Sequence, residues 1–161
     1  MACLLGDVLL SSAFLTYTGF FDHFYRQYLQ SEWKFFIEQI GLKYRTDMSF
    51  MEFLSKPTDR LHWQMQELPN DELCIENAII LKRYNRYPLI IDPSDQALKF
   101  IMNHYADRKI QKTSFADDSF MKNLETSIRF GLPLLVQDVE KIDPVLNSYS
   151  IKRSRKLEGE F

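Results

Sequence analysis

The sequence predicts an α/β fold in which a parallel sheet with flanking helices follows a helical N-terminal segment. Two observations lead to this prediction. In the first part of the chain, apolar residues recur every three or four positions, which is the period of an amphipathic helix. After Pro88, short apolar runs alternate with helical stretches. Strands separated by helices of this length form parallel sheets through right-handed crossovers.

Two consecutive helices are expected at the start of the chain, over residues 7–18 and 20–40, joined near Gly19. The uncharged run 8–21 is too short to span a bilayer and lacks a preceding basic region, so we expect a buried helix here rather than a membrane anchor. The second helix carries an apolar stripe of helical spacing: Phe21, Phe24, Tyr25, Tyr28, Leu29, Trp33, Phe36, Ile37 and Ile40. We interpret the stripe as a core face; the alternative is a surface on which a partner docks.

The middle of the chain is expected to contain two more helices. A short helix over residues 47–55 is followed by an irregular connector over 58–69. A longer helix then starts at a cap formed by Asn70 or Asp71, and the basic residues of its last turn complement the helix dipole.

The remainder provides the sheet and the helices that cover it. Strands are predicted over residues 88–92, 108–115 and 133–139, and helices over 94–105 and 117–131. We expect the first of these helices to open at Ser94 and the second to stop at Gly131.

The composition argues against several classes of function. With 20 basic and 22 acidic residues, the chain has no charge excess that would attract nucleic acid. Cys3 and Cys74 lack the spacing of a zinc site or a disulfide framework, which fits a reducing compartment. The 3 histidines are far apart and show no metal-ligand spacing, so no metal is predicted.

The turn between the first predicted strand and its helix has the position of a phosphate-binding loop but not its chemistry. A working loop needs glycines, a lysine and a hydroxyl that binds magnesium. Here the turn contains no glycine and no lysine, and Pro93 removes one N–H donor. The carboxylates of Asp92 and Asp95 would repel a triphosphate by about 1–4 kcal/mol. The loop position Asp92, Pro93, Ser94, Asp95 and Gln96 is therefore not expected to bind nucleotide.

The magnesium position of a nucleotide site is also incomplete. An apolar strand that ends in Asp138 could face a metal ion, but Val139 follows where a catalytic acid would be needed. We interpret Asp138 as a carboxylate at the edge of the sheet, and we predict neither a catalytic residue nor a bound cofactor for this chain.

Three stretches together resemble a known family. Residues 72–97 (ELCIENAIILKRYNRYPLIIDPSDQA) and 108–147 look like the fifth AAA+ module of the dynein heavy chain family, closest to the cytoplasmic form. Residues 6–33 are similar to the family's segment that re-enters the motor ring after the stalk. In this comparison Asp92, Pro93, Gln96 and Ala97 match a degenerate turn, whereas Asp95 stands where the family usually has glycine.

The resemblance implies a role and an organisation. It implies a partial AAA+ core of three strands, with residues 1–69 as the helical segment following the stalk, 70–147 as the core and 148–161 as a divergent, disordered tail in which the likeness ends. The parent would be a minus-end-directed microtubule motor that uses ATP and magnesium, located in the cytoplasm with the cytoskeleton. The chain itself would be non-catalytic, contacting neighbouring AAA+ modules, the stalk and its buttress, and meeting microtubules only through the parent.

Two alternatives remain open at this point. The chain could be a stand-alone ATP-binding domain, against which the missing glycine, lysine and second acid argue. It could also be a small interaction protein that docks through the aromatic helix of residues 20–40.

Overall fold

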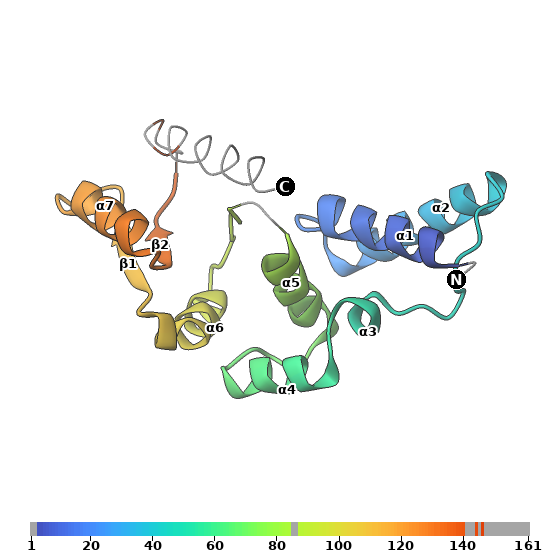
Figure 1. The fold of residues 1–161 in the computed structure, drawn as a ribbon, viewed down its shortest axis with the longest axis horizontal. Coiled ribbons are helices and arrows are strands. Elements are labelled where there is room, and N and C mark those ends of the chain that lie inside the picture. Colours follow the sequence, from blue (N-terminus) through green and yellow to red (C-terminus); the bar gives the residue numbers. More distant parts are fainter. Residues whose placement is uncertain (1–2, 85–86, 141–143, 145, 147–161) are drawn as a thin grey trace. The chain divides into compact units, whose positions relative to one another are not determined.

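A computed structural model describes residues 3–84, 87–140, 144 and 146 of the chain. The chain forms two compact units, one running to His104 and the other starting at Tyr105 (Figure 1). The first unit holds α1 (Leu4–Tyr17), α2 (His23–Gln39), α3 (Phe50–Leu54), α4 (Pro57–Met65), α5 (Glu72–Arg83) and α6 (Gln96–His104). The second holds the short 3-10 helix η1 (Ala106–Arg108), β1 (Gln111–Ser114), α7 (Phe120–Phe130) and β2 (Leu134–Gln137). The functional division near residue 70 remains a prediction.

The core of the first unit is built where α1 meets α2, α3 and α5. Phe14 on α1 is fully buried, and its ring stacks on that of Phe50 with 4.9 Å between the centroids. Other buried apolar side chains complete this core: Leu10, Ile37, Ile75, Ala78 and Ile79. The two predicted N-terminal helices are thus confirmed. No helix in the described part of the chain is long and apolar enough to cross a membrane.

The beginning of α1 packs directly against the backbone that follows α2. A Cβ atom on Gly6 would lie 2.4 Å from the carbonyl oxygen of Lys43, so only glycine allows this approach. The next residue, Asp7, is buried and accepts hydrogen bonds from the backbone N and the Nε of Arg45 at 2.9 and 2.7 Å. Close contact and a buried carboxylate therefore fix this end of the helix.

A buried arginine joins the α1–α2 turn to α5. Arg26 is only 1% exposed, and its Nη1 and Nη2 donate to Glu76 Oε2 at 2.8 Å and to Asn77 Oδ1 at 2.6 Å. Its Nε donates to the carbonyl oxygens of Thr18 and Phe21 at 3.0 and 2.9 Å. Because the guanidinium is held from both sides, the turn and α5 are fixed relative to each other.

The apolar stripe of α2 does not form the expected core face. Ile37 is buried, but Phe24, Tyr28 and Phe36 are 72%, 55% and 60% exposed. The core interpretation is therefore wrong for most of the stripe. The reason is the rotation of the helix: the buried hydrogen bonds of Arg26 require that residue to face α5, which turns the aromatic residues outward.

The segment predicted as an irregular connector contains a helix, α4, so that prediction is wrong. Pro57 occupies the first turn of α4, where a missing N–H costs nothing. The carboxylate of Asp59 accepts the backbone N–H of Lys56 at 3.2 Å and so supports the start of the helix. For α5 the prediction is confirmed: the Asp71 side chain caps the helix by accepting the N–H of Cys74 at 2.8 Å.

The first predicted strand, residues 88–92, is not a strand in the structure. Two of its apolar side chains face solvent, since Leu89 and Ile91 are 70% and 88% exposed. Within the described residues no neighbouring strand pairs with it. A strand exists only when its backbone N–H and C=O groups bond to a neighbour, so an apolar run without one stays irregular.

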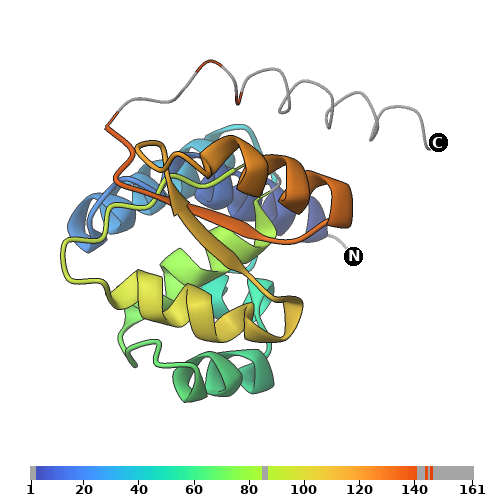
Figure 2. The same ribbon diagram turned by 90° about the vertical axis from the view of Figure 1, so that its left-hand side faces the viewer.

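The second unit is the predicted strand–helix–strand arrangement. β1 and β2 pair in parallel, with Gln111 opposite Leu134 and Ser114 opposite Gln137, and α7 packs on both strands (Figure 2). As predicted, α7 stops at Gly131, whose φ of 65° lies in the left-handed region that favours glycine. On this helix Phe120 and Leu124 are buried, whereas Ile128 is 49% exposed. The predicted tail, residues 148–161, lies outside the described residues.

Candidate functional site

In the turn that precedes α6, the side chain of Asp92 occupies the place where a phosphate loop would hold its ligand. The carboxylate of Asp92 accepts the backbone N–H of Gln96 at 3.0 Å and that of Leu98 at 2.8 Å. These N–H groups at a helix N-terminus are the donors that phosphate loops offer to anions. The cap of α6 is thus Asp92, and the predicted opening at Ser94 is wrong.

The other residues of the predicted loop form an exposed bend around this cap. Pro93, Ser94, Asp95 and Gln96 are all exposed. Asp95 has a φ of 57°, a left-handed conformation that aspartate tolerates better than most residues. The backbone of Asp95 thus has a conformation that glycine adopts readily, although the residue is an aspartate.

Asp138 follows β2 in the second unit, whereas the turn before α6 belongs to the first unit. It is exposed, and its φ of 52° is also left-handed. No cluster of three or more histidine, cysteine or acidic side chains that could hold a metal ion occurs among the described residues. Within the first unit, the structure therefore brings Asp92 and Gln96 together.

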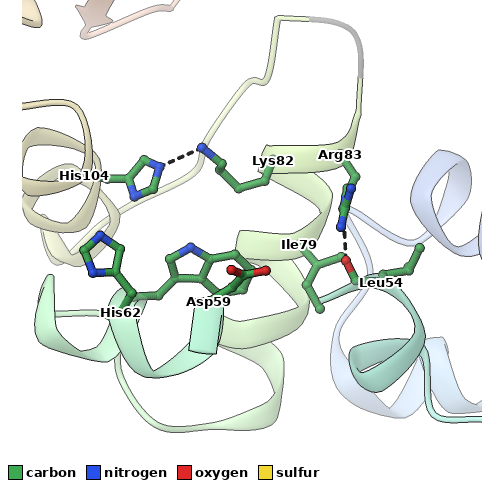
Figure 3. A pocket seen from close by; sticks show the side chains of 8 residues that line it. Leu54, Asp59, His62, Ile79, Lys82, Arg83 and His104 are labelled. Atoms are coloured by element: carbon green, nitrogen blue, oxygen red, sulfur yellow. Dashed lines mark hydrogen bonds between the residues drawn. The ribbon is translucent and has the colours of Figure 1, made fainter. Parts of the chain in front are cut away.

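A hollow of about 370 Å³ lies elsewhere in the first unit, between α4, α5 and α6 (Figure 3). Its lining includes Asp59, His62 and Trp63 from α4, Ile79, Lys82 and Arg83 from α5, and His104 from α6. Sequence reasoning missed this cluster because its members come from three helices, one of which was not predicted. The only signal in the sequence was the basic pair at the end of α5, which was interpreted as a complement to the helix dipole.

Hydrogen bonds join four side chains along one wall of the hollow. Lys82 Nζ lies 2.6 Å from His104 Nε2, and His104 Nδ1 lies 2.6 Å from Gln66 Oε1. Gln66 Nε2 in turn lies 2.9 Å from His62 Nε2. Because the Gln66 oxygen can only accept and the Lys82 ammonium can only donate, His104 is neutral, with its proton on Nδ1.

The surroundings of His104 oppose its protonation. Burial lowers the pKa of His104 from its ordinary value, and electrostatic interactions with Lys82 and His62 lower it further. In the unfolded chain the imidazole binds a proton below about pH 6.5, whereas the folded protein resists protonation until a lower pH. The unfolded state thus binds more protons in this range, and the contribution of His104 to stability decreases as the pH falls.

We expect the free energy of unfolding to decrease between about pH 7 and pH 5, and His104→Gln to reduce the steepness of that decrease. Glutamine can accept from Lys82 and donate to Gln66 but cannot titrate. Urea denaturation of both proteins across this pH range measures the effect. An equal pH dependence in both would contradict the assignment of His104 as a neutral side chain.

Comparisons with known proteins identify the family of the chain. A family model described as the ATP-binding dynein motor region matches residues 61–160. The match continues beyond Asn147, where the resemblance found in the sequence was expected to end. The cytoplasmic dynein heavy chain of Dictyostelium discoideum is 60% identical over 99% of this chain, and that of Drosophila melanogaster is 55% identical over 99%. Axonemal heavy chain 5 of Mus musculus is 37% identical over 98%.

The chain covers only a small part of these relatives, about 3% of each. Its helical N-terminal region and its parallel β1–β2 pair with flanking helices confirm the predicted fold class, part of an AAA+ α/β fold. Since the family model covers residues 61–160, well over half of the chain, the chain belongs to the family of dynein motor regions.

Proposed function

We propose that this chain is a structural AAA+ module, the fifth of the ring, in a dynein-like motor that moves toward microtubule minus ends. It binds no nucleotide and performs no catalysis, and it couples the ATPase ring to the stalk. ATP and magnesium serve the parent motor at other modules. The match to a dynein motor region over residues 61–160 supports the ring assignment.

The observation that carries the proposal is the Asp92 cap. Its carboxylate already accepts the N–H groups of Gln96 and Leu98, at 3.0 and 2.8 Å, so a phosphate would have to displace a charge of its own sign. The lysine and glycines of a phosphate loop are also missing from this turn. The family's description as ATP-binding then refers to the motor region as a whole, and not to the loop of this chain.

The coupling role is supported by the way in which α1 and α2 are attached. The turn between them is joined to α5 through Arg26, whose guanidinium bonds to both sides, and α1 packs closely at Gly6. A segment attached by buried, directional contacts moves with its neighbour as a rigid body. Movement of the stalk would in this way pass to the ring without being absorbed at the junction.

The partners in this proposal follow from the assignment. They are the neighbouring AAA+ modules and the stalk with its buttress, while microtubules are reached only through the parent. Neither nucleic acid nor a membrane is a partner, in keeping with the balanced charge of the chain. The parent operates in the cytoplasm on the cytoskeleton.

Titration of the chain with a fluorescent ATP analogue and magnesium tests the proposal. We expect no saturable binding in the micromolar range. The variant with Asp92→Asn and Asp95→Asn keeps a good capping side chain at position 92 but removes two negative charges. We expect it not to bind either, because the lysine is still missing. Saturable micromolar binding to the natural chain would instead favour the stand-alone ATP-binding domain.

A second candidate function, a helix-mediated interaction protein, is favoured by the exposure of the α2 aromatics. Phe24 and Phe36 are 72% and 60% exposed, and several large apolar side chains lie beside them on the helix. Exposed apolar faces of this kind mark surfaces that another protein segment covers. The two candidates differ in whether that segment belongs to the same heavy chain or to a separate protein.

A further inference from the structure

His104, the last residue of α6, joins this helix to both α5 and the end of α4. Its Nε2 lies 2.6 Å from Lys82 Nζ on α5 (Figure 3), and its Nδ1 lies 2.6 Å from the side-chain oxygen of Gln66, which follows α4. The Gln66 amide nitrogen continues to His62 Nε2 on α4 at 2.9 Å. These four side chains, Lys82, His104, Gln66 and His62, are called the histidine network below.

The three hydrogen bonds of the histidine network all point the same way. Lys82 donates to His104, and His104 donates from Nδ1 to the oxygen of Gln66. The amide nitrogen of Gln66 then donates to Nε2 of His62, which accepts only if that nitrogen carries no proton. The network is therefore complete only while both histidines are neutral.

A proton added to His104 breaks its contact with Lys82. Both ring nitrogens of a protonated histidine are donors, so Nε2 would oppose the ammonium group with a second donor and a second positive charge. The two nitrogens lie only 2.6 Å apart, and two donors do not remain at that distance. The contact thus exists in the neutral form of the ring alone.

A proton added to His62 reaches the same contact through Gln66. Nε2 of His62 becomes a donor, and Gln66 offers it an acceptor only by turning its amide over. The NH2 group of Gln66 then faces the N–H on Nδ1 of His104, which again places two donors together. Moving the His104 proton to Nε2 does not solve this, because Nε2 faces the Lys82 ammonium. A proton at either histidine therefore removes a bond of His104.

The charged groups around the network do not favour an additional proton. Lys82 and Arg83 from α5 are positive, and Asp59 from α4 is the one acidic side chain among the described residues that line the hollow. The pKa of His104 is lowered by burial and by its interactions with Lys82 and His62, which agrees with this arrangement.

We propose that the histidine network is a pH-dependent switch, which attaches the last turn of α6 when both histidines are neutral and releases it when either binds a proton. The rest of the helix stays packed, because Phe100 and Ile101 are 2% and 6% exposed. The chain passes directly from His104 to Tyr105, where the second unit starts, so the switch acts at the junction of the two units along the chain. The proposal is independent of whether the chain binds nucleotide.

Amide hydrogen exchange of the whole chain, followed by NMR between pH 7 and pH 5 and corrected for the intrinsic exchange rate, tests the switch. The amides of Ile101, Met102 and His104 report on the last turn of α6, and those of Leu10 and Phe14 report on the core helix α1. Repeating the measurement at low urea concentrations separates the two kinds of opening. A local release exposes little surface and depends little on urea, whereas global unfolding depends on it strongly.

We expect the opening constant of the last turn to increase about tenfold or more between pH 7 and pH 5, because a released histidine with a pKa near 6.5 is almost fully protonated at pH 5. The increase should depend little on urea. His62→Gln and His104→Gln should each reduce it, and the double variant should abolish it, since glutamine replaces the hydrogen bonds but does not titrate. His23→Gln on α2 is the matched control and should leave the increase unchanged.

Three outcomes would overturn the proposal. The first is an opening constant that does not change with pH, and the second is an increase that persists in the double variant. The third is a urea dependence as steep as that of Leu10 and Phe14, which would mean that only global unfolding senses the proton. If the double variant does not fold, Lys82→Met replaces it: His104 then holds a proton without facing a cation, so an increase as large as in the natural chain would refute the switch.

Discussion

Replacing Arg26 by methionine should lower the free energy of unfolding by about 3–5 kcal/mol, the usual effect of removing one partner from a buried ion pair. The change leaves Glu76, which is 5% exposed, as a buried carboxylate without its cation. It also removes the Nε donor from the carbonyl groups of Thr18 and Phe21, of which the Thr18 carbonyl still accepts the N–H of Phe21. Urea denaturation followed by tryptophan fluorescence measures the loss, and circular dichroism shows whether the variant still folds.

A second substitution distinguishes charge from packing. The double variant Arg26→Met, Glu76→Met removes both charges and should recover much of the lost stability, because no buried charge is then unpaired. Arg129→Met, on the exposed surface of α7, should change the free energy of unfolding by less than about 0.5 kcal/mol. If the double variant were no more stable than Arg26→Met alone, the buried pair would not be the source of the effect.

Replacing Phe14 by alanine should cost about 3–5 kcal/mol, the typical loss for a large aromatic side chain in a core. Phe14 is fully buried and stacked on Phe50, so its removal leaves a cavity that rigid helices cannot close. Since domains of this size have a total stability of about 5–15 kcal/mol, the variant should be largely unfolded at moderate urea concentration. The midpoint of urea denaturation is the measurement.

Phe36→Ala is the matched control for this prediction. The same residue type stands on α2, but its side chain is 60% exposed, so the free energy of unfolding should change by less than about 0.5 kcal/mol. A loss as large as that of Phe14→Ala would mean that the aromatic stripe is covered in solution, and it would restore the core interpretation of α2.

Much of the local structure could be predicted from the sequence, because short-range chemistry determines it. Asp71 caps α5, Gly131 ends α7 in a left-handed conformation, and the second unit has the expected strand–helix–strand order. These features depend on neighbours within a few positions of the chain, for which residue type is informative. The acidic turn around Asp92 led to the prediction that it does not bind nucleotide, but the capping of α6 by the Asp92 side chain was not predicted.

Two of the failures, the missed helix α4 and the opening of α6, concern local signals that were misinterpreted. The others concern contacts between distant residues. The rotation of α2 depends on Arg26 reaching Glu76, fifty positions away, and periodicity alone does not reveal such a partner. The segment 88–92 has a strand-like composition, but a strand also needs a neighbour. The hollow could not be predicted because Trp63, Arg83 and His104 approach one another only after three helices pack.

The unpaired segment before α6 also has a consequence for handling the protein. Leu89 and Ile91 are largely exposed, and the backbone between them makes no hydrogen bond within the described residues. Two molecules can satisfy these groups by pairing their segments edge to edge, a reaction whose extent rises with protein concentration. We therefore expect association of the isolated chain at high concentration to limit experiments before its folding stability does. Measurements of stability should be made on dilute samples.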